Sequence, residues 1–185
     1  MKTILLSFLF FTAFVNAQET EFSFTLEKGL TDFIITPVEG KTSAEIYKKT
    51  LDWIKETYKN PDKVILMTVE NELIRFEGSS DSFYALNLMG KQYQNSRYLI
   101  EVNFKDGKYK FDLISIESFS QGWNKLTFFN YHTSKEFLDN TTVFKKDGTL
   151  RSTFKYLPEV PIYFNNLNKS LLESITTTVK KSDGW

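Results

Sequence analysis

The clearest structural signal in this chain is the segment RYLIEVNFKDGKYKFDLISIE, which runs from Arg97 to Glu117. It turns at Asp106-Gly107, a pair favoured in type I′ turns because both central residues of such a turn need positive φ. If Lys105 pairs with Lys108 across this turn, the apolar residues of both halves fall on one face and the polar residues on the other. The apolar pairs are then Phe104 with Tyr109, Val102 with Phe111 and Ile100 with Leu113, and the other face pairs Asn103 with Lys110, Glu101 with Asp112 and Leu99 with Ile114. The segment therefore predicts a β-hairpin with one buried and one largely polar face.

Two shorter strands are expected just before the hairpin. Val64 to Val69 and Leu73 to Gly78 are rich in β-branched and apolar residues, and a tight turn at Glu70-Asn71-Glu72 separates them. In the second run, Ile74 and Phe76 alternate with charged residues, which is typical of a sheet that has one solvated face. The two runs therefore predict a second antiparallel pair.

Other segments have weaker strand signals. Asp32 to Val38 predicts a strand that ends or lies at a sheet edge, because Pro37 has no N–H to donate to a ladder. Ser79 to Ser82 is expected to be a loop, followed by a strand from Phe83 to Met89. Phe144 to Tyr156 contains a second Asp-Gly pair and predicts a short hairpin.

A helix is expected after the first strand. Thr42-Ser43-Ala44-Glu45 has the form of a capping box, in which the Thr and Glu side chains satisfy backbone N–H groups at the helix start. Asn60-Pro61 ends this helix, since proline disfavours helical geometry in the residue before it. Its expected apolar stripe consists of Tyr47, Leu51, Ile54 and Tyr58.

A second amphipathic helix is expected from Asn166 onward, and Pro158 and Pro161 separate it from the segment before it. Lys180 and Lys181 fall in its last turn, where basic residues complement the helix dipole. Its expected apolar positions are Leu167, Leu171, Leu172, Ile175 and Val179.

The order of these elements predicts the fold class. A strand, a helix, four or more antiparallel strands and a final helix follow one another, with no repeat or linker to divide them. Each helix has an apolar stripe that must be buried against another element. We therefore expect one α+β domain over residues 18–185, with an antiparallel sheet of about five strands and both helices packed on one face.

The first residues predict a cleavable export signal. Lys2 supplies a positive charge, Ile4 to Val15 is almost entirely apolar, and small residues precede a cleavage site after Ala17. The apolar run is shorter than the roughly 20 residues that a membrane-spanning helix needs. The chain has no cysteine for lipid attachment or for a disulfide. We expect residues 1–17 to be a signal peptide and the remaining chain to be periplasmic or extracellular, without stable membrane insertion.

The charge balance argues against binding to nucleic acid. The whole chain carries 23 basic and 23 acidic residues, and loss of Lys2 with the leader leaves 22 against 23, a net charge of −1. Such a chain creates no overall field that attracts phosphate groups. Aromatic residues make up 16% of the chain, and we expect most of them to fill the core.

Four segments carry a family resemblance. They are EGKTSAEIYKKTLDWIKETYKNP at the first helix, the hairpins at Glu70 to Gly78 and Phe104 to Leu113, and YLPEVPIYFNNLNKSL from Tyr156 to Leu171. Together they resemble a secreted bacterial family described as a domain of unknown function with a TBP-like fold. The resemblance implies the order β-α-β-β-β-β-α, with two helices on one face of the sheet, and it implies no activity. It does not imply DNA binding, because a saddle on the minor groove needs many cationic contacts that this composition lacks.

Motifs for nucleotide binding and nucleophilic catalysis are incomplete. Gly40-Lys41-Thr42 imitates the end of a Walker A loop, but the first glycine of that loop would fall at Ile35. We interpret this tripeptide as a turn and a helix cap. His132 is the single histidine and has no glycine-elbow motif nearby, so we expect no catalytic triad and no His/Cys metal site. The sequence predicts no enzyme activity and no cofactor.

Pairs of carboxylates are the remaining catalytic candidates, because the acid and base of a glycosidase can be far apart in sequence. Glu70 with Glu72 and Glu101 with Asp112 are the nearest pairs. Each pair also fits a solvated turn or a wet sheet face, and we favour that interpretation. No twelve-residue run places oxygen ligands at alternate positions as a calcium loop requires.

The strongest binding candidates lie in Ser118 to Val143, which we expect to be a loop with short elements. They are the aromatic residues Trp123, Phe128, Phe129 and Tyr131. Aromatic rings on loops stack on sugars or anchor peptide partners, and burial in the core is the alternative for each of them. Two functions fit these observations. The preferred one is an exported, non-catalytic domain that binds a protein partner or a cell-envelope component, and the alternative is a carbohydrate-binding module or a weak glycan-active enzyme.

Overall fold

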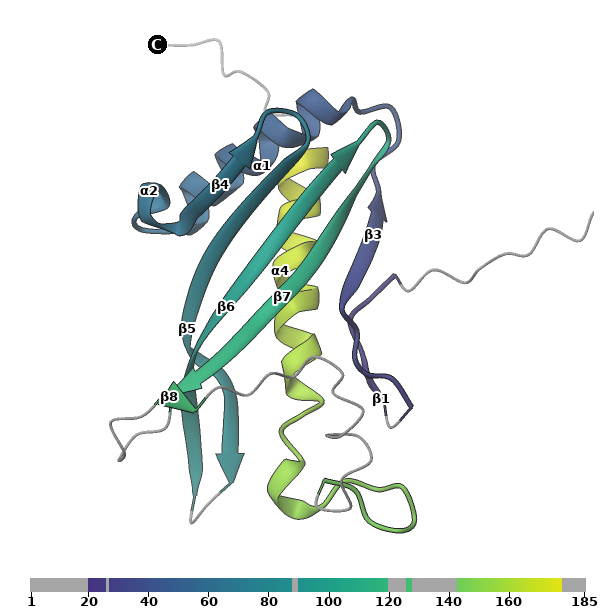
Figure 1. Ribbon diagram of the computed structural model, residues 1–185, viewed down its shortest axis with the longest axis vertical. Helices are drawn as coiled ribbons and strands as arrows, with labels where there is room; N and C mark the ends of the chain where they lie inside the picture. The colour runs from purple at the N-terminus through teal and green to yellow at the C-terminus, as the bar shows by residue number, and fades with distance from the viewer. Residues whose placement is uncertain (1–19, 26, 88–89, 120–125, 128–142, 178–185) are drawn as a thin grey trace, which may run out of the picture.

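The computed structural model describes residues 20–177, apart from residues 26, 88–89, 120–125 and 128–142. The predicted signal peptide and the positions Val179, Lys180 and Lys181 lie outside the described residues. Two long helices and one main antiparallel sheet make up most of the described chain (Figure 1). The helices are α1 (Ser43–Thr57) and α4 (Glu159–Thr176), and a single turn, α2 (Pro61–Val64), follows α1.

The main sheet has the strand order β3-β7-β6-β5-β4, and every neighbouring pair is antiparallel. Its strands are β3 (Phe33–Pro37), β4 (Ile65–Val69), β5 (Leu73–Asn87), β6 (Lys91–Lys105) and β7 (Lys108–Phe119). A short strand, β8 (Leu126–Thr127), pairs with the end of β7, and β1 (Phe24–Thr25) pairs with β2 (Gly29–Leu30) in a separate ribbon. The predicted α+β class with a sheet of about five strands is confirmed.

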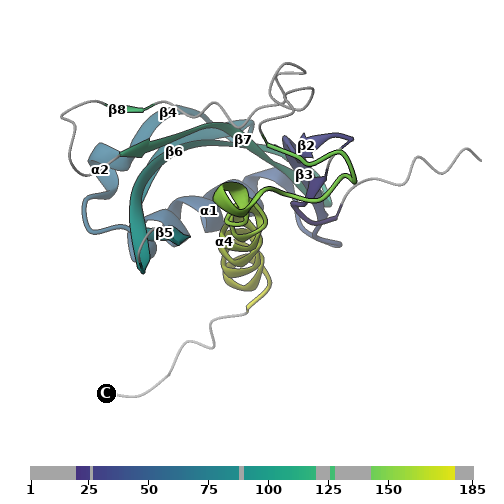
Figure 2. The same cartoon turned by 90° about the horizontal axis from the view of Figure 1, so that it is seen from below.

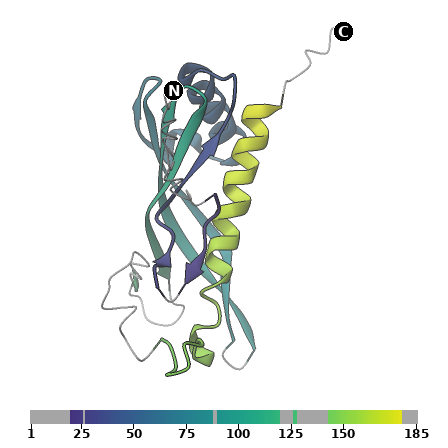
Figure 3. The same ribbon diagram turned by 90° about the vertical axis from the view of Figure 1, so that its right-hand side faces the viewer.

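Both long helices cover the same face of the sheet, as expected. Seen along its length, the sheet arches over α1 and α4, and neither long helix lies on its other face, which we call the open face (Figure 2). Figure 3 shows α4 standing alongside the sheet, with the β1–β2 ribbon beside the sheet near β3. The core lies between these layers, and its largest fully buried side chains include Phe76, Tyr98, Tyr109, Phe111 and Phe164.

The predicted register of the central hairpin is confirmed from its turn to Ile100, which lies opposite Leu113. Beyond that pair the expected register is wrong, because a β-bulge between Leu99 and Ile100 shifts it and Leu99 lies opposite Ser115. Ile114 is the extra residue of the bulge. Such a bulge bends the strand and increases its twist, which suits a sheet that arches over two helices.

The expected loop from Ser79 to Ser82 is wrong, because β5 runs through it. Ser79 pairs with Arg97 and Ser80 with Ser96, and the register then shifts before Tyr84 pairs with Gln94. The serine-rich composition favours a turn locally, but the long partner strand β6 supplies backbone hydrogen bonds along the whole segment. The strand expected from Phe83 is therefore the second half of β5.

The apolar face of α1 is rotated from the predicted stripe. Its buried residues are Ile46, Thr50, Trp53 and Ile54, whereas Tyr47, Leu51 and Tyr58 are half-buried at the rim. Thr50 is tolerated inside because its hydroxyl donates to the carbonyl of Ile46 at 2.8 Å. Because a threonine gives no apolar signal in the sequence, the predicted stripe follows Tyr47 and Leu51 instead of their neighbours Ile46 and Thr50.

The final helix begins earlier than predicted, at Glu159 rather than Asn166. Pro161 does not separate α4 from the preceding segment but lies in its first turn, where a missing N–H costs no helical hydrogen bond. The helix ends at Thr176, with Thr177 in an extended conformation. Its buried face consists of Val160, Pro161, Phe164, Asn168, Leu171 and Ile175.

The short hairpin predicted within Phe144 to Tyr156 is confirmed from Phe144 to Leu150, whereas Ser152–Phe154 forms a short 3₁₀ helix. Phe144 and Leu150 form an isolated antiparallel bridge, and the Lys145 N–H donates to the carbonyl of Thr149 at 2.8 Å. Gly148 has φ of +79°, a conformation that glycine adopts without strain. Asp147 accepts hydrogen bonds from the backbone and the hydroxyl of Thr149, which holds its pKa below the usual value.

Candidate functional site

The aromatic residues predicted to bind a ligand lie outside the described residues. Trp123, Phe128, Phe129 and Tyr131 all fall in the gaps, as does His132. Their roles stay predictions. The candidate site below is therefore built from other residues.

The tripeptide Gly40-Lys41-Thr42 serves as a turn and a helix cap, as predicted. Gly40 has φ of +74°, and the Thr42 hydroxyl accepts a hydrogen bond from the Glu45 N–H at 3.3 Å. The Glu45 carboxylate in turn accepts from the Thr42 N–H at 2.9 Å, which completes the capping box and lowers the pKa of Glu45. These groups are occupied in starting α1.

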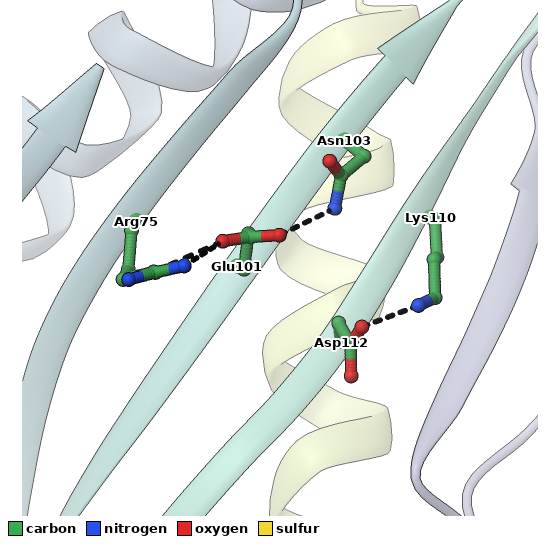
Figure 4. A network of polar contacts seen from close by, with 5 residues as sticks. All are labelled: Arg75, Glu101, Asn103, Lys110 and Asp112. Carbon is green, nitrogen blue, oxygen red and sulfur yellow. Dashed lines mark hydrogen bonds and ion pairs between the residues drawn. The ribbon is translucent and has the colours of Figure 1, made fainter. Parts of the chain in front are cut away.

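The carboxylates Glu101 and Asp112 lie opposite each other on the open face of the sheet, and each has its own cation (Figure 4). Glu101 accepts two hydrogen bonds from Arg75, at 2.6 and 2.9 Å, and one from the Asn103 amide at 3.0 Å. Asp112 forms an ion pair with Lys110. Partial burial acts to raise the pKa of Glu101, but the hydrogen bonds from Asn103 and Arg75 hold it below its usual value. A general acid needs a raised pKa, and that of Glu101 is lowered. We therefore interpret Glu101 and Asp112 as members of ion pairs on the sheet surface, as the sequence favoured.

The other carboxylate pair, Glu70 and Glu72, lies in the turn between β4 and β5. Both side chains are exposed, and Asn71 between them adopts φ of +60°. This is also the solvated turn that the sequence favoured.

A second charge cluster joins three neighbouring strands around Arg97. The Arg97 guanidinium donates to Glu117 on β7, with 2.7 Å between Nε and the carboxylate, and lies 3.5 Å from the Glu77 carboxylate on β5. The hydrogen bond to Glu117 is the main cause of the raised pKa of Arg97. The guanidinium is thus a permanent charge that is fixed in place by two carboxylates.

Arg97 borders a surface hollow of about 680 Å³, which we call the β5 hollow. One wall is the segment Glu77 to Asp81 of β5, and the opposite wall comes from the end of α1 and from α2. The described lining residues besides these strand residues and Arg97 are Thr57, Tyr58, Lys59, Asn60, Lys63 and Val64.

The β5 hollow exists because β4 is much shorter than β5. β4 pairs only with Leu73 to Phe76, so the edge of β5 beyond Phe76 has no partner strand on this side among the described residues. The Phe104 N–H donates to the carbonyl of Glu72. Backbone hydrogen bonding alternates along a strand, so the N–H and C=O groups of even-numbered residues in this part of β5 point toward β6, and those of odd-numbered residues point away from it. The backbone groups of Glu77 and Ser79 therefore point toward the hollow.

The floor behind this edge is closely packed. Gly78 lies opposite Tyr98, and a Cβ atom at Gly78 would overlap the Tyr98 ring. The Tyr98 hydroxyl lies 3.0 Å from that of Tyr58 and 3.1 Å from that of Tyr163, so three phenols link α1, β6 and α4. Burial raises the pKa of both Tyr58 and Tyr98 well above the usual value, so both stay protonated.

The lining of the β5 hollow is polar and slightly basic. Lys59, Lys63 and Arg97 face Glu77 and Asp81, and the serine hydroxyls add neutral donors and acceptors. Neither Lys59 nor Lys63 forms an ion pair with any described residue. This arrangement offers hydrogen bonds and charge to a ligand but no nucleophile with an adjacent base.

A smaller hollow of about 330 Å³ lies between β3 and α4, and its polar groups are engaged in holding the fold together. The Asn165 amide grips the backbone of Phe22, accepting from its N–H at 2.7 Å and donating to its carbonyl at 2.9 Å. Asn168 accepts from the Tyr109 hydroxyl at 2.8 Å and donates to Thr36 at 3.2 Å. We interpret these contacts as structural.

Two further searches concern the described residues alone. No group of three or more His, Cys, Asp or Glu residues in them is arranged to hold a metal ion. None of the helices in the described part of the chain has both the length and the apolar character of a membrane span.

The sequence did not predict the β5 hollow. Lys59, Arg97 and Ser79 are ordinary polar residues at separate places in the chain, and only the unequal lengths of β4 and β5 bring them to one edge. No local pattern gave a signal for it, because Lys91 to Ser96 is mostly polar although it forms the first part of β6.

Comparison with known families supports the fold derived above. Residues 35–118 match the profile of a family described as "Domain of unknown function (DUF4468) with TBP-like fold". The resemblance to this DUF4468 family is confirmed. The matched DUF4468 segment runs from β3 to the end of β7 and so includes both walls of the β5 hollow.

Two crystal structures are similar to this chain as a whole. A DUF4468 family protein from Bacteroides ovatus has a TM-score of 0.62 and 14% identity, with 90% of this chain and 95% of that chain covered. A TBP-like protein from Parabacteroides distasonis has a TM-score of 0.55 and 13% identity, with 79% of this chain and 92% of that chain covered. At such identities the similarity establishes the fold alone. No curated protein matches this chain.

Proposed function

We propose that this chain is an exported, non-catalytic domain that binds an extended segment of a protein partner along the open edge of β5. The observation that carries the proposal is the difference in strand length, because β4 begins opposite Phe76 while β5 continues past it. Farther along β5, the Ala85 N–H donates to the Glu159 carboxylate at 3.3 Å, so the proposed site is the edge at Glu77 and Ser79. An exposed strand edge with unpaired N–H and C=O groups is a ready template for an added strand.

The β5 hollow has the form that such binding requires. The backbone of Glu77 and Ser79 supplies hydrogen bonds for an antiparallel or parallel partner, and the opposite wall from Thr57 to Val64 limits the width. Lys59 and Lys63 lie on that wall as cations without described ion-pair partners. A partner segment with acidic side chains on that side fits best, since opposite charges favour encounter and register.

The chemistry of the lining supports binding rather than catalysis. The described lining contains no histidine and no cysteine, and its carboxylates lie beside the lysines and Arg97. The predicted leader supports export to the periplasm or beyond, where the partner is either another exported protein or a protein of the cell envelope.

The test starts from residues 18–185 and a displayed library of linear peptides. We expect selection of peptides rich in β-branched residues with one or more acidic positions. Binding of a selected peptide is expected to slow hydrogen exchange at the Ser79 amide, because that N–H becomes paired.

A proline variant makes the test specific to this edge. Ser79→Pro removes one N–H that faces the hollow and leaves the ladder to β6 intact, so it is expected to weaken peptide binding by at least tenfold. Ile35→Pro, on the opposite edge strand β3, is the matched control and is expected to leave the affinity unchanged. Equal loss in both variants, or binding of glycans in the absence of any peptide binding, would overturn the proposal in favour of a carbohydrate-directed function.

A further inference from the structure

The outer edge of β4 is apolar and exposed in the described structure. β4 is the sequence Ile-Leu-Met-Thr-Val, with no charged residue, and it ends the strand order of the sheet. Leu66 is 55% exposed and Met67 is 45% exposed. Natural edge strands are commonly protected by charges or prolines within the strand, and β4 has neither.

The charges that flank β4 differ at its two ends. The segment before the strand carries Lys59 and Lys63 against Asp62, whereas the turn after it carries Glu70 and Glu72 and no basic residue. One end of the strand is therefore positive and the other negative. An antiparallel copy of the same strand would place each end beside its opposite.

We propose that two copies of this chain associate through an antiparallel pair of β4 strands, related by a two-fold axis at Met67. The strand edge used here is distinct from the peptide site, because it is the far edge of a different strand, although both proposals use Lys63. Met67 lies opposite Arg75 and Val69 lies opposite Leu73. The backbone N–H and C=O groups of Arg75 and Leu73 point toward β4, so those of Met67 and Val69 point toward β5. The backbone groups of Thr68 therefore point to the free edge.

With the two-fold axis at Met67, apolar side chains of the two copies pack together and opposite charges lie close to each other. The two Met67 side chains, on the open face of the sheet, lie next to each other across the axis, and Leu66 of one copy lies opposite Thr68 of the other. Lys63 of one copy then approaches Glu70 of the second copy, twice by symmetry. Because a five-residue strand buries less than a standard interface, the dimer is expected to be weak and to form in the micromolar range or above.

The experiment is sedimentation of residues 18–185 over a wide range of concentrations. We expect a reversible equilibrium between monomer and dimer, with no larger species. Thr68→Pro removes an N–H at the free edge, and Met67→Lys places two like charges at the axis. Each is expected to leave a monomer at every concentration, with unchanged circular dichroism to show that it still folds. Ile162→Lys, at a 58% exposed apolar residue on α4, is the matched control and is expected to dimerise like the original chain.

Charge reversal tests the register itself. Lys63→Glu and Glu70→Lys are each expected to weaken dimerisation about tenfold, since each replaces two attractive contacts by two repulsive ones. The double variant is expected to recover the original affinity. A chain that stays monomeric throughout, a double variant that stays as weak as the singles, or equal loss in Ile162→Lys would overturn the proposal.

Discussion

Gly78 leaves room for the ring of Tyr98 on the neighbouring strand. The Tyr98 ring lies over the position that a side chain at Gly78 would take, and two phenol hydroxyls hold that ring in place. Gly78→Ala is therefore expected to lower the free energy of unfolding by about 1–3 kcal/mol, the usual cost of overpacking. Urea unfolding measures this change. Ser79→Ala, on the other face of the same strand, is the control and is expected to change stability by less than about 0.5 kcal/mol. Equal effects would show that the ring yields easily.

A buried amide on α4 stabilises the core through two hydrogen bonds. Asn168 satisfies the hydroxyls of Tyr109 and Thr36, which are themselves buried. Asn168→Ala leaves both without this partner, and we expect a loss of about 2 kcal/mol in the free energy of unfolding. Thermal and urea unfolding of this variant are compared with those of Asn166→Ala, an exposed neighbour on the same helix. If the two variants lose the same stability, the network contributes nothing specific.

At the scale of elements, α1 depends on the cap that precedes it. Thr42 makes both bonds of the capping box with Glu45, and the Ser43 N–H also donates to Asp106 in the hairpin turn at 2.7 Å. Thr42→Ala is expected to cost about 1 kcal/mol in the free energy of unfolding, whereas Thr42→Ser retains the hydroxyl and most of the stability. Circular dichroism during urea unfolding checks both. A serine variant as unstable as the alanine variant would contradict the role of the hydroxyl.

The elements that the sequence predicted correctly are those whose signals are local. The Asp106-Gly107 turn, the Thr42 cap and the alternation around Ile74 each depend on a few adjacent residues, and each was found where expected. The type I′ geometry expected for the turn is wrong, because Gly107 has positive φ and Asp106 does not. The errors occurred where a partner elsewhere in the chain decides the outcome. The serines after Gly78 became a strand because β6 pairs with them, and Thr50 became buried because a backbone carbonyl accepts from its hydroxyl.

The candidate site was beyond prediction for the same reason. Its walls come from the end of α1 and from β5, and no local pattern records that β4 pairs with only Leu73 to Phe76 of β5. The aromatic residues that the sequence favoured, such as Trp123, fall outside the described residues.

For the whole molecule, titration predicts a stability maximum at intermediate pH. Glu45, Glu101 and Asp147 have lowered pKa values in the folded state, from ordinary values of 4.5, 4.5 and 3.8. The unfolded chain therefore binds more protons in acid, and their stabilisation is present above these ordinary values and is lost as the pH falls through the folded values. We expect the urea midpoint to fall below about pH 4.5, less steeply in Glu101→Gln. A urea midpoint of the original chain that does not change below about pH 4.5 would contradict this prediction.

The alkaline limb has the opposite sign and a different cause. Burial raises the pKa of Tyr58, Tyr98 and Tyr109 above their ordinary value of 10.0. The unfolded chain releases these protons first, so stability is complete below pH 10 and falls as the pH rises above it. We expect tyrosinate absorbance from these three residues to appear only together with unfolding. Its appearance in the folded protein would show that the phenols are not buried as described.

The grip of Asn165 on the backbone of Phe22 joins two parts of the chain that are 143 residues apart in sequence. A polypeptide made from its N-terminus cannot form this contact until residue 165 has been synthesised. By then every strand of the main sheet has already been made. The segment at Phe22 is therefore anchored late, although it is among the first described residues to be synthesised.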